Sequence, residues 1–220
     1  MPLSIINIVL AVTFVYLLSN RKSLGEYKIK VLLYIVLLNF VVELVVYFVN
    51  RSDFKKGSSW IYNFTLPIEL FLYGVLFKRI FQQQWVTLLI SIASWVILIF
   101  IAHHYFQKDS FFIFNASLYT YMCLFILACV LYFFIRLFIK DYFHINPLKQ
   151  FYFWLSSGLL ICYLGGFMLL TNAYTLFYSD KLLYDDLKIL NLFLNIFLYL
   201  CVIIGIECLK KFKVHQIQSL

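Results

Sequence analysis

The chain has 220 residues, of which 64% are hydrophobic and only 13% are charged. Soluble domains are roughly 45–50% apolar and about 25% charged, so this composition excludes a water-soluble globular protein. The net charge of +8 lies in short blocks between long apolar runs. That pattern is typical of loops at lipid headgroups and excludes a basic nucleic-acid-binding face.

Seven apolar runs approach the length of about 20 residues that a membrane-spanning helix needs. They lack the in/out alternation of an outer-membrane barrel. The first run is short, and we interpret it as a retained span because no charged segment of a signal peptide precedes it. The sequence therefore predicts an all-α polytopic membrane protein, a single seven-helix transmembrane domain over residues 1–220 without a soluble domain. The predicted spans are 3–19, 31–49, 60–77, 85–102, 114–135, 151–171 and 189–208.

The orientation of these spans follows from the basic residues in the loops. One side of the predicted bundle carries roughly twice as many Lys and Arg residues as the other, and the richer side faces the cytoplasm. An odd number of spans then places the N-terminus outside and the C-terminus inside. The predicted location is the inner (cytoplasmic) membrane of a bacterial cell, with several passes.

Spans two and three each carry a carboxylate, Glu43 and Glu69. An ionisable side chain at the centre of a span costs about 2.5–3.5 kcal/mol on insertion scales, so both require a reason. At a rise of about 1.5 Å per residue, Glu43 lies roughly 9 Å and Glu69 roughly 13 Å below the outer surface. Because a short loop joins the two spans, we expect the carboxylates to lie at similar depth on neighbouring helices.

Other polar residues share the helical faces of these two acids, and together they predict a polar chamber in the outer half of the bundle. Pro67 frees the backbone carbonyl of Asn63, one turn earlier, and can kink span three toward this chamber. The alternative is an interhelical hydrogen-bond network that binds no ligand. The residues predicted to line the chamber with Glu43 and Glu69 are Asn39 and Tyr47 in span two, Tyr62, Thr65 and Tyr73 in span three, and Asn191 and Asn195 in span seven.

The remaining ionisable groups favour simpler interpretations. Glu207 is expected to pair with Lys211 at the cytoplasmic headgroups. His103 and His104 end span four and, with the two glutamates, offer a weak alternative as a metal site. The five cysteines lie in or beside apolar runs without metal-ligand spacing, which indicates buried, inert thiols. The sequence predicts no cofactor.

Three stretches carry a resemblance to known proteins: "LPIELFLYGVLF", "FWLSSGLLICYLGGFMLL" and "LNLFLNIFLYLCVIIGIEC". They resemble seven-span membrane proteins of uncharacterised activity in Bacteroidetes-type bacteria. The shorter "LPIEL" is similar to the Pro-x-Glu-Glu motif of membrane-bound lycopene cyclases, although Leu70 stands where that motif has its second glutamate.

Three functional hypotheses follow. The first is a sensor or receptor-like module that binds a small molecule, lipid or cation in the chamber and acts on a cytoplasmic or membrane signalling partner. The second is an enzyme acting on a lipid or isoprenoid, with Glu69 as general acid and Glu43 as its partner. The third is a transporter or an oligomeric pore, which the lack of an inverted repeat disfavours. Membrane lipids are expected partners in each case, and nucleic acid is not.

Overall fold

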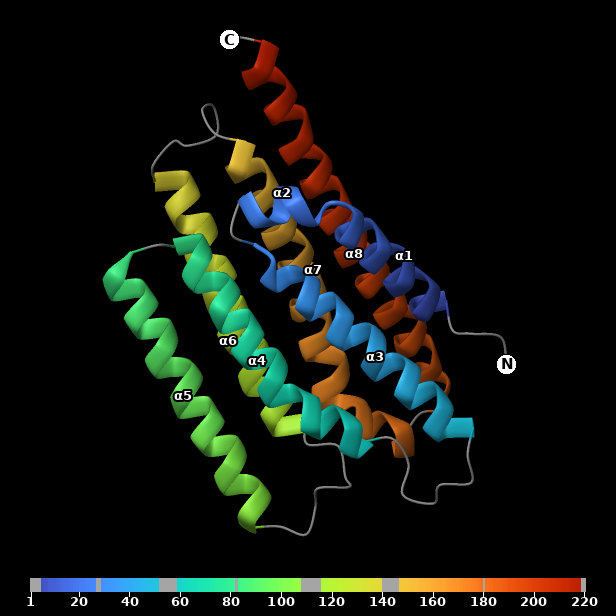
Figure 1. Ribbon diagram of the computed structural model, residues 1–220. Helices are drawn as coiled ribbons and strands as arrows, with labels where there is room; N and C mark the ends of the chain where they lie inside the picture. The colour runs from blue at the N-terminus through green and yellow to red at the C-terminus, as the bar shows by residue number, and fades with distance from the viewer. Residues whose placement is uncertain are drawn as a thin grey trace.

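The computed structural model describes residues 5–26, 29–51, 59–81, 83–107, 116–139, 147–179 and 181–218. Within these ranges the chain is all-helical and forms eight helices (Figure 1). They are α1 (Ile5–Ser19), α2 (Arg21–Glu26), α3 (Val31–Arg51), α4 (Ser59–Phe81), α5 (Gln84–Gln107), α6 (Ala116–Ile139), α7 (Pro147–Ser179) and α8 (Lys181–Gln218).

Each of the seven predicted spans falls on one of these helices, and α2 is an additional short helix between the first two. Within α3, α5, α6 and α8, the segments Val31–Asn50, Gln84–His103, Ala116–Leu137 and Ile189–Lys210 are long and apolar enough to cross a membrane. α1 and the Phe151–Phe167 part of α7 are shorter apolar helices. The protein is therefore a helical membrane protein, while the count of seven spans and their direction stay predictions.

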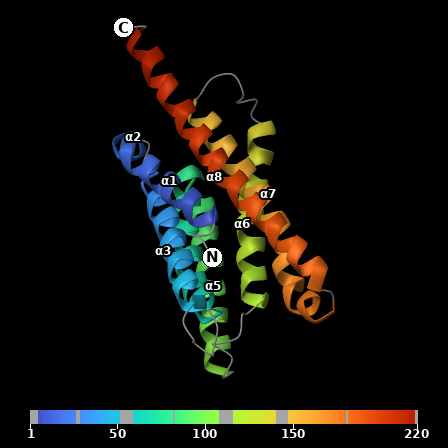
Figure 2. The ribbon, with the colours of Figure 1, turned by 90° about the vertical axis from the view of Figure 1, so that its right-hand side faces the viewer.

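The order of helix packing does not simply follow the chain. The most extensive contact joins α7 and α8, and α6 packs on α7. α1 contacts both α3 and α8, so the first and last helices of the chain lie side by side (Figure 2). α5 stands at the edge of the bundle beside α4, and its outward side chains include Trp85, Trp95 and Phe100, all more than half exposed. An apolar exposed face of this kind is expected against lipid tails.

Glycines bring α7 and α8 close together. A Cβ atom at Gly158 would lie 2.9 Å from Cβ of Cys201 and 3.4 Å from Cα of Leu198. At Gly205, it would lie 3.2 Å from the carbonyl oxygen of Phe151. Small residues permit this approach of backbones in membrane helices. Gly158 thus lies at a close contact between α7 and α8.

Pro67 lies within α4. A proline within a helix lacks the N–H that would bond the carbonyl four residues earlier, and that carbonyl belongs to Asn63. In the structure, the hydroxyl of Tyr105 on α5 donates a hydrogen bond to the Asn63 carbonyl. A side chain of the neighbouring helix thus satisfies the backbone group that the proline leaves open, and it ties α5 to α4.

We expect Tyr105→Phe to lower the free energy of unfolding by about 1 kcal/mol, because it leaves the Asn63 carbonyl without this donor. Denaturant titration of the detergent-solubilised protein, followed by circular dichroism, measures the change. Tyr121→Phe is the matched control, since Tyr121 is 47% exposed on α6. Equal stability of both variants and the wild type would contradict the prediction.

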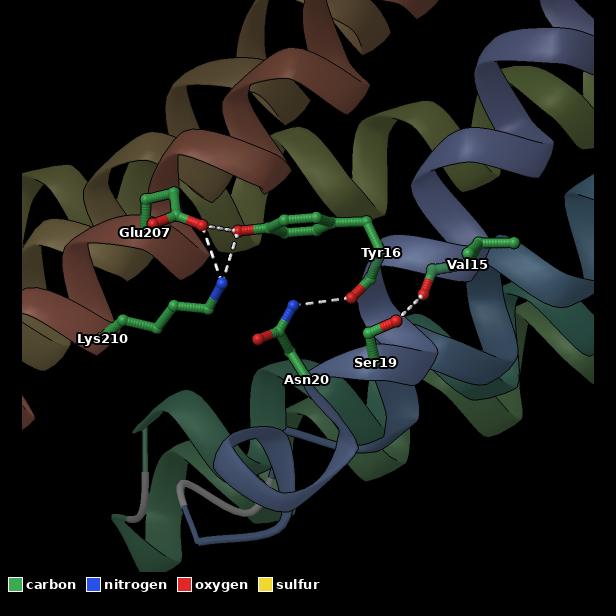
Figure 3. Close-up of polar contacts among 6 residues, drawn as sticks. All are labelled: Val15, Tyr16, Ser19, Asn20, Glu207 and Lys210. Carbon is green, nitrogen blue, oxygen red and sulfur yellow. Dashed lines mark hydrogen bonds and ion pairs between the residues drawn. The ribbon is translucent and has the colours of Figure 1, made fainter.

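A second contact between distant segments ties α1 to α8 (Figure 3). The hydroxyl of Tyr16 donates to the Glu207 carboxylate, and Nζ of Lys210 lies 2.8 Å from Oε1 of Glu207 and 3.1 Å from the Tyr16 hydroxyl. The same ammonium lies 4.7 Å from the centroid of the Tyr16 ring. Lys210 thus pairs with Glu207 at i+3. The side chain of Lys211, the partner expected from the sequence, lies outside the described residues.

Candidate functional site

The two glutamates of the predicted chamber lie on neighbouring helices, α3 and α4. The hydroxyl of Tyr62 on α4 donates a 3.2 Å hydrogen bond to Oε1 of Glu43 on α3. Glu69 lies two turns further along α4 and within electrostatic range of Glu43. Both carboxylates are half-buried. The structure thus brings together the pair of acids that the sequence predicts to be close.

Glu69 differs from Glu43 in its partners. Glu43 accepts a hydrogen bond from Tyr62. The carboxylate of Glu69 has no hydrogen-bond or ion-pair partner among the residues that the structure describes. A carboxylate taken out of water without a partner is costly, so Glu69 is the group of this site whose position most needs an explanation.

A hydrogen bond across the bundle adds α8 to the site. Nδ2 of Asn39 on α3 lies 3.4 Å from the hydroxyl of Tyr199 on α8. Asn39 lies one turn before Glu43 on the same face of α3, and Tyr199 lies within electrostatic range of both glutamates. The contact brings α8 to this part of α3 through Tyr199, a residue outside the polar stripe of Asn191 and Asn195 that the sequence predicts.

Tyrosines from four helices lie within electrostatic range of Glu69. Tyr73 on α4 is 2% exposed, and its ring lies 5.7 Å from that of Tyr163 on α7 at an interplanar angle of 88°. Gly166 on α7 leaves room for Tyr119 of α6, because a Cβ atom there would lie 2.8 Å from the Tyr119 hydroxyl. The tyrosines within electrostatic range of Glu69 are Tyr62, Tyr73, Tyr119, Tyr163 and Tyr199. We refer to Glu43, Glu69, Asn39 and these five tyrosines as the glutamate–tyrosine cluster.

Four predicted chamber residues have contacts of their own. The hydroxyl of Thr65 donates to the carbonyl of Tyr62 at 3.0 Å. Tyr47 makes an edge contact with Phe48, with ring centroids 5.6 Å apart. Nδ2 of Asn195 donates to the Asn191 carbonyl at 2.8 Å, so these two asparagines interact within α8. Both asparagines lie N-terminal to Tyr199 on the same helix.

The described residues contain no group of three His, Cys, Asp or Glu side chains that could hold a metal ion. His103 is exposed on α5, and the side chain of His104 lies outside the described residues. The buried thiols of Cys123 and Cys162 lie within electrostatic range of Glu69. The donor set near the glutamates thus consists of two carboxylates, phenols, an amide and thiols.

Tyr119, Tyr163 and Tyr199 are the cluster residues that the sequence interpretation missed. Their only sequence signal is spacing: Tyr199 follows Asn191 and Asn195 at steps of four, and Tyr163 precedes Gly166 by three. In a chain with 21% aromatic residues, such spacing also fits tyrosines that face lipid or core. Contacts between α6, α7 and α8 determine which of them face Glu69.

Comparison with known proteins adds no functional information, because no family model, curated protein or solved structure matches the chain. The glutamate–tyrosine cluster is therefore the basis for any functional inference.

Proposed function

We propose that the protein binds a small molecule, a lipid or a cation at the glutamate–tyrosine cluster and acts as a sensor or receptor-like module. In this proposal it crosses the inner membrane of a bacterium seven times, with the N-terminus outside and the cluster in the outer half of the bundle. Ligand binding there would alter how α3, α4 and α8 pack, and a cytoplasmic or membrane partner would respond to that change.

The observation that carries the proposal is the carboxylate of Glu69. It lies within electrostatic range of Glu43 and five tyrosines, yet it has no hydrogen-bond or ion-pair partner among the described residues. If these residues served only to pack the helices, an apolar residue in place of Glu69 would make the fold more stable, because interhelical hydrogen bonds in membranes contribute only about 0.6–2 kcal/mol. Retention of two costly acids is better explained by binding, since functional sites commonly contain destabilising groups.

Native mass spectrometry of gently extracted protein tests this proposal. The wild type is compared with the double variant Glu43→Gln/Glu69→Gln and with Asp186→Asn, a control that removes an exposed acid of α8. We expect a bound species on the wild type and on the control that is absent from the folded double variant. The same species on all three proteins, with equal or higher stability of the double variant, would contradict ligand binding at the cluster.

One observation favours the enzyme as a second candidate. Glu43 has a hydrogen-bond donor and Glu69 has none among the described residues. Two carboxylates in unequal surroundings are the arrangement in which one acts as general acid. Incubation of the protein with membrane lipid extract, followed by lipid mass spectrometry, would reveal turnover that Glu69→Gln abolishes. An unchanged lipid profile would contradict this alternative.

A further inference from the structure

We infer that the ligand of the glutamate–tyrosine cluster is an organic cation, a molecule with a protonated amine or a quaternary ammonium group. This inference rests on the proposed function and specifies its ligand class. It follows from the charge of the site, from the aromatic rings around it and from the kinds of donor that the site has.

The described basic side chains do not pair with the carboxylates of the cluster. No hydrogen bond or ion pair joins Glu43 or Glu69 to a Lys, Arg or His side chain in the part of the chain that the structure describes. The ion pair that the structure describes, between Glu207 and Lys210, lies two turns or more further along α8 than Tyr199. A region of low dielectric disfavours the ionised form of each acid, and a cation between the two carboxylates offsets that cost, because attraction between charges is strongest where water is excluded.

The aromatic rings favour an organic cation in particular. The face of a tyrosine ring attracts ammonium groups within about 6 Å. The rings of Tyr73 and Tyr163 pack edge to face, nearly perpendicular to each other. Tyr199, from a third helix, is 4% exposed and bonded to Asn39. Carboxylates combined with tyrosines from several helices resemble the aromatic cages that bind choline and methylated amines.

A metal ion fits this set of donors poorly. The described part of the chain brings no three carboxylate, imidazole or thiolate groups together. The remaining groups at or near the cluster are neutral phenols, one amide and the buried thiols of Cys123 and Cys162. Calcium and magnesium require about six or more oxygen ligands, most of them carboxylate, carbonyl or water. An ammonium ion needs only charge, a few acceptors and ring faces, all of which the cluster provides.

Glu69 retains accessible surface, whereas Tyr73 and Leu76 on the same side of α4 do not. It is half-buried, whereas Leu70, Tyr73 and Leu76 on the same helix are 0%, 2% and 0% exposed. Tyr73 and Leu76 lie close to Glu69 around the helix at 100° per residue. An unpartnered carboxylate that keeps accessible surface is a group that a ligand can reach.

Thermal unfolding of the purified, delipidated full chain tests the inference. The probes are choline, tetramethylammonium and 3,3-dimethyl-1-butanol, the uncharged isostere of choline, at constant ionic strength. We expect choline or tetramethylammonium to raise the melting temperature of the wild type and the neutral alcohol to leave it unchanged. Equal stabilisation by the alcohol, or no effect of either ammonium probe, would overturn the inference.

Two variants distinguish the contribution of the carboxylate charge to ammonium binding from the contribution of the tyrosine residues. We expect Glu69→Gln to weaken ammonium binding about tenfold or more, and Tyr73→Phe, which keeps the ring, to weaken it less than about threefold. Asp186→Asn should leave binding unchanged. Wild-type affinity in Glu69→Gln, with the folded state verified by circular dichroism, would contradict the assignment of the charge to this residue.

The ammonium group can come from a free amine or from a lipid headgroup. Reconstitution with phosphatidylethanolamine or with phosphatidylglycerol, each followed by native mass spectrometry, distinguishes these sources. Retention of phosphatidylethanolamine alone, displaced by choline, assigns a lipid. Choline binding with neither lipid retained assigns a free amine. Preferential retention of phosphatidylglycerol that depends on Glu69 would overturn the inference.

Failure of this inference differs from failure of the proposed function. A neutral or anionic molecule that binds the wild type and is absent from Glu43→Gln/Glu69→Gln would leave the binding site valid and refute the cationic ligand. If no bound species differs between these proteins and no probe stabilises the wild type, both proposals are wrong.

Discussion

Gly158→Leu is expected to lower the free energy of unfolding by about 3 kcal/mol, the upper end of the range for overpacking a tight contact. A Cβ atom at this position would meet Cβ of Cys201 at 2.9 Å, Cδ1 of Leu198 at 3.1 Å and Cα of Leu198 at 3.4 Å. Two of these atoms belong to the main chain or lie next to it, so α7 and α8 must separate to admit the new side chain. This contact is the most extensive between helices in the bundle.

Two control variants make the Gly158 experiment specific. Ala128→Leu adds a similar side chain at an exposed position of α6, and we expect a change within about 0.5 kcal/mol. Gly165→Ala should cost less than Gly158→Leu, because its Cβ atom would meet the ends of the flexible Leu194 side chain. Unfolding in denaturant, followed by circular dichroism, measures all three. A stability of Gly158→Leu equal to that of Ala128→Leu would refute close packing at this glycine.

Asn7→Leu is expected to raise the free energy of unfolding by about 1–3 kcal/mol. Asn7 is 1% exposed on α1, and neither Nδ2 nor Oδ1 of its amide has a hydrogen-bond partner among the described residues. Leucine has a similar branched shape without polar atoms. Replacing an unsatisfied buried group by an apolar one of like shape removes the cost of its desolvation.

Thr13→Val is the matched control for Asn7→Leu. Thr13 lies on the same buried face of α1 and is 0% exposed, but its hydroxyl donates to the Val9 carbonyl at 2.8 Å. We expect Thr13→Val to change stability by less than about 1 kcal/mol, because that hydroxyl already has a partner. The same denaturant titration measures both variants. A loss of stability in Asn7→Leu would mean that the amide serves an interaction that the protein needs.

The sequence predicts the helices and part of the cluster well, because these depend on local physics. Long apolar runs form helices at the expected places. The carbonyl of Asn63, which loses its helical partner because Pro67 has no N–H, accepts a hydrogen bond from Tyr105 instead. Glu43 and Tyr62 meet because a short loop joins their helices. The ends of α7 and α8 are not predicted, since both helices continue beyond their apolar cores.

The remaining cluster residues depend on interactions between segments far apart in the chain. Tyr199 reaches Asn39 only because α8 returns to α3 across 160 residues. For Asn191 and Asn195 the sequence suggests more than the structure records. Their spacing predicts that they line the chamber, but in the structure these two side chains interact with each other. Whether a polar side chain faces the cluster depends on the rotation of its helix about the helix axis. Hydrophobic periodicity is a weak guide to that rotation in helices with lipid on one side and the protein core on the other, because both sides are apolar.

The pairing of α1 with α8 has a consequence for biogenesis. Tyr16 and its partner Glu207 are separated by 191 residues. At about 5–20 residues per second, the ribosome needs about 10–40 s to synthesise that interval. During this time α1 has no final partner on its α8 side, and the amide of Asn7 remains in a half-assembled bundle. Retention of α1 by the insertion machinery, or by a membrane chaperone, until α8 emerges would protect it from premature association.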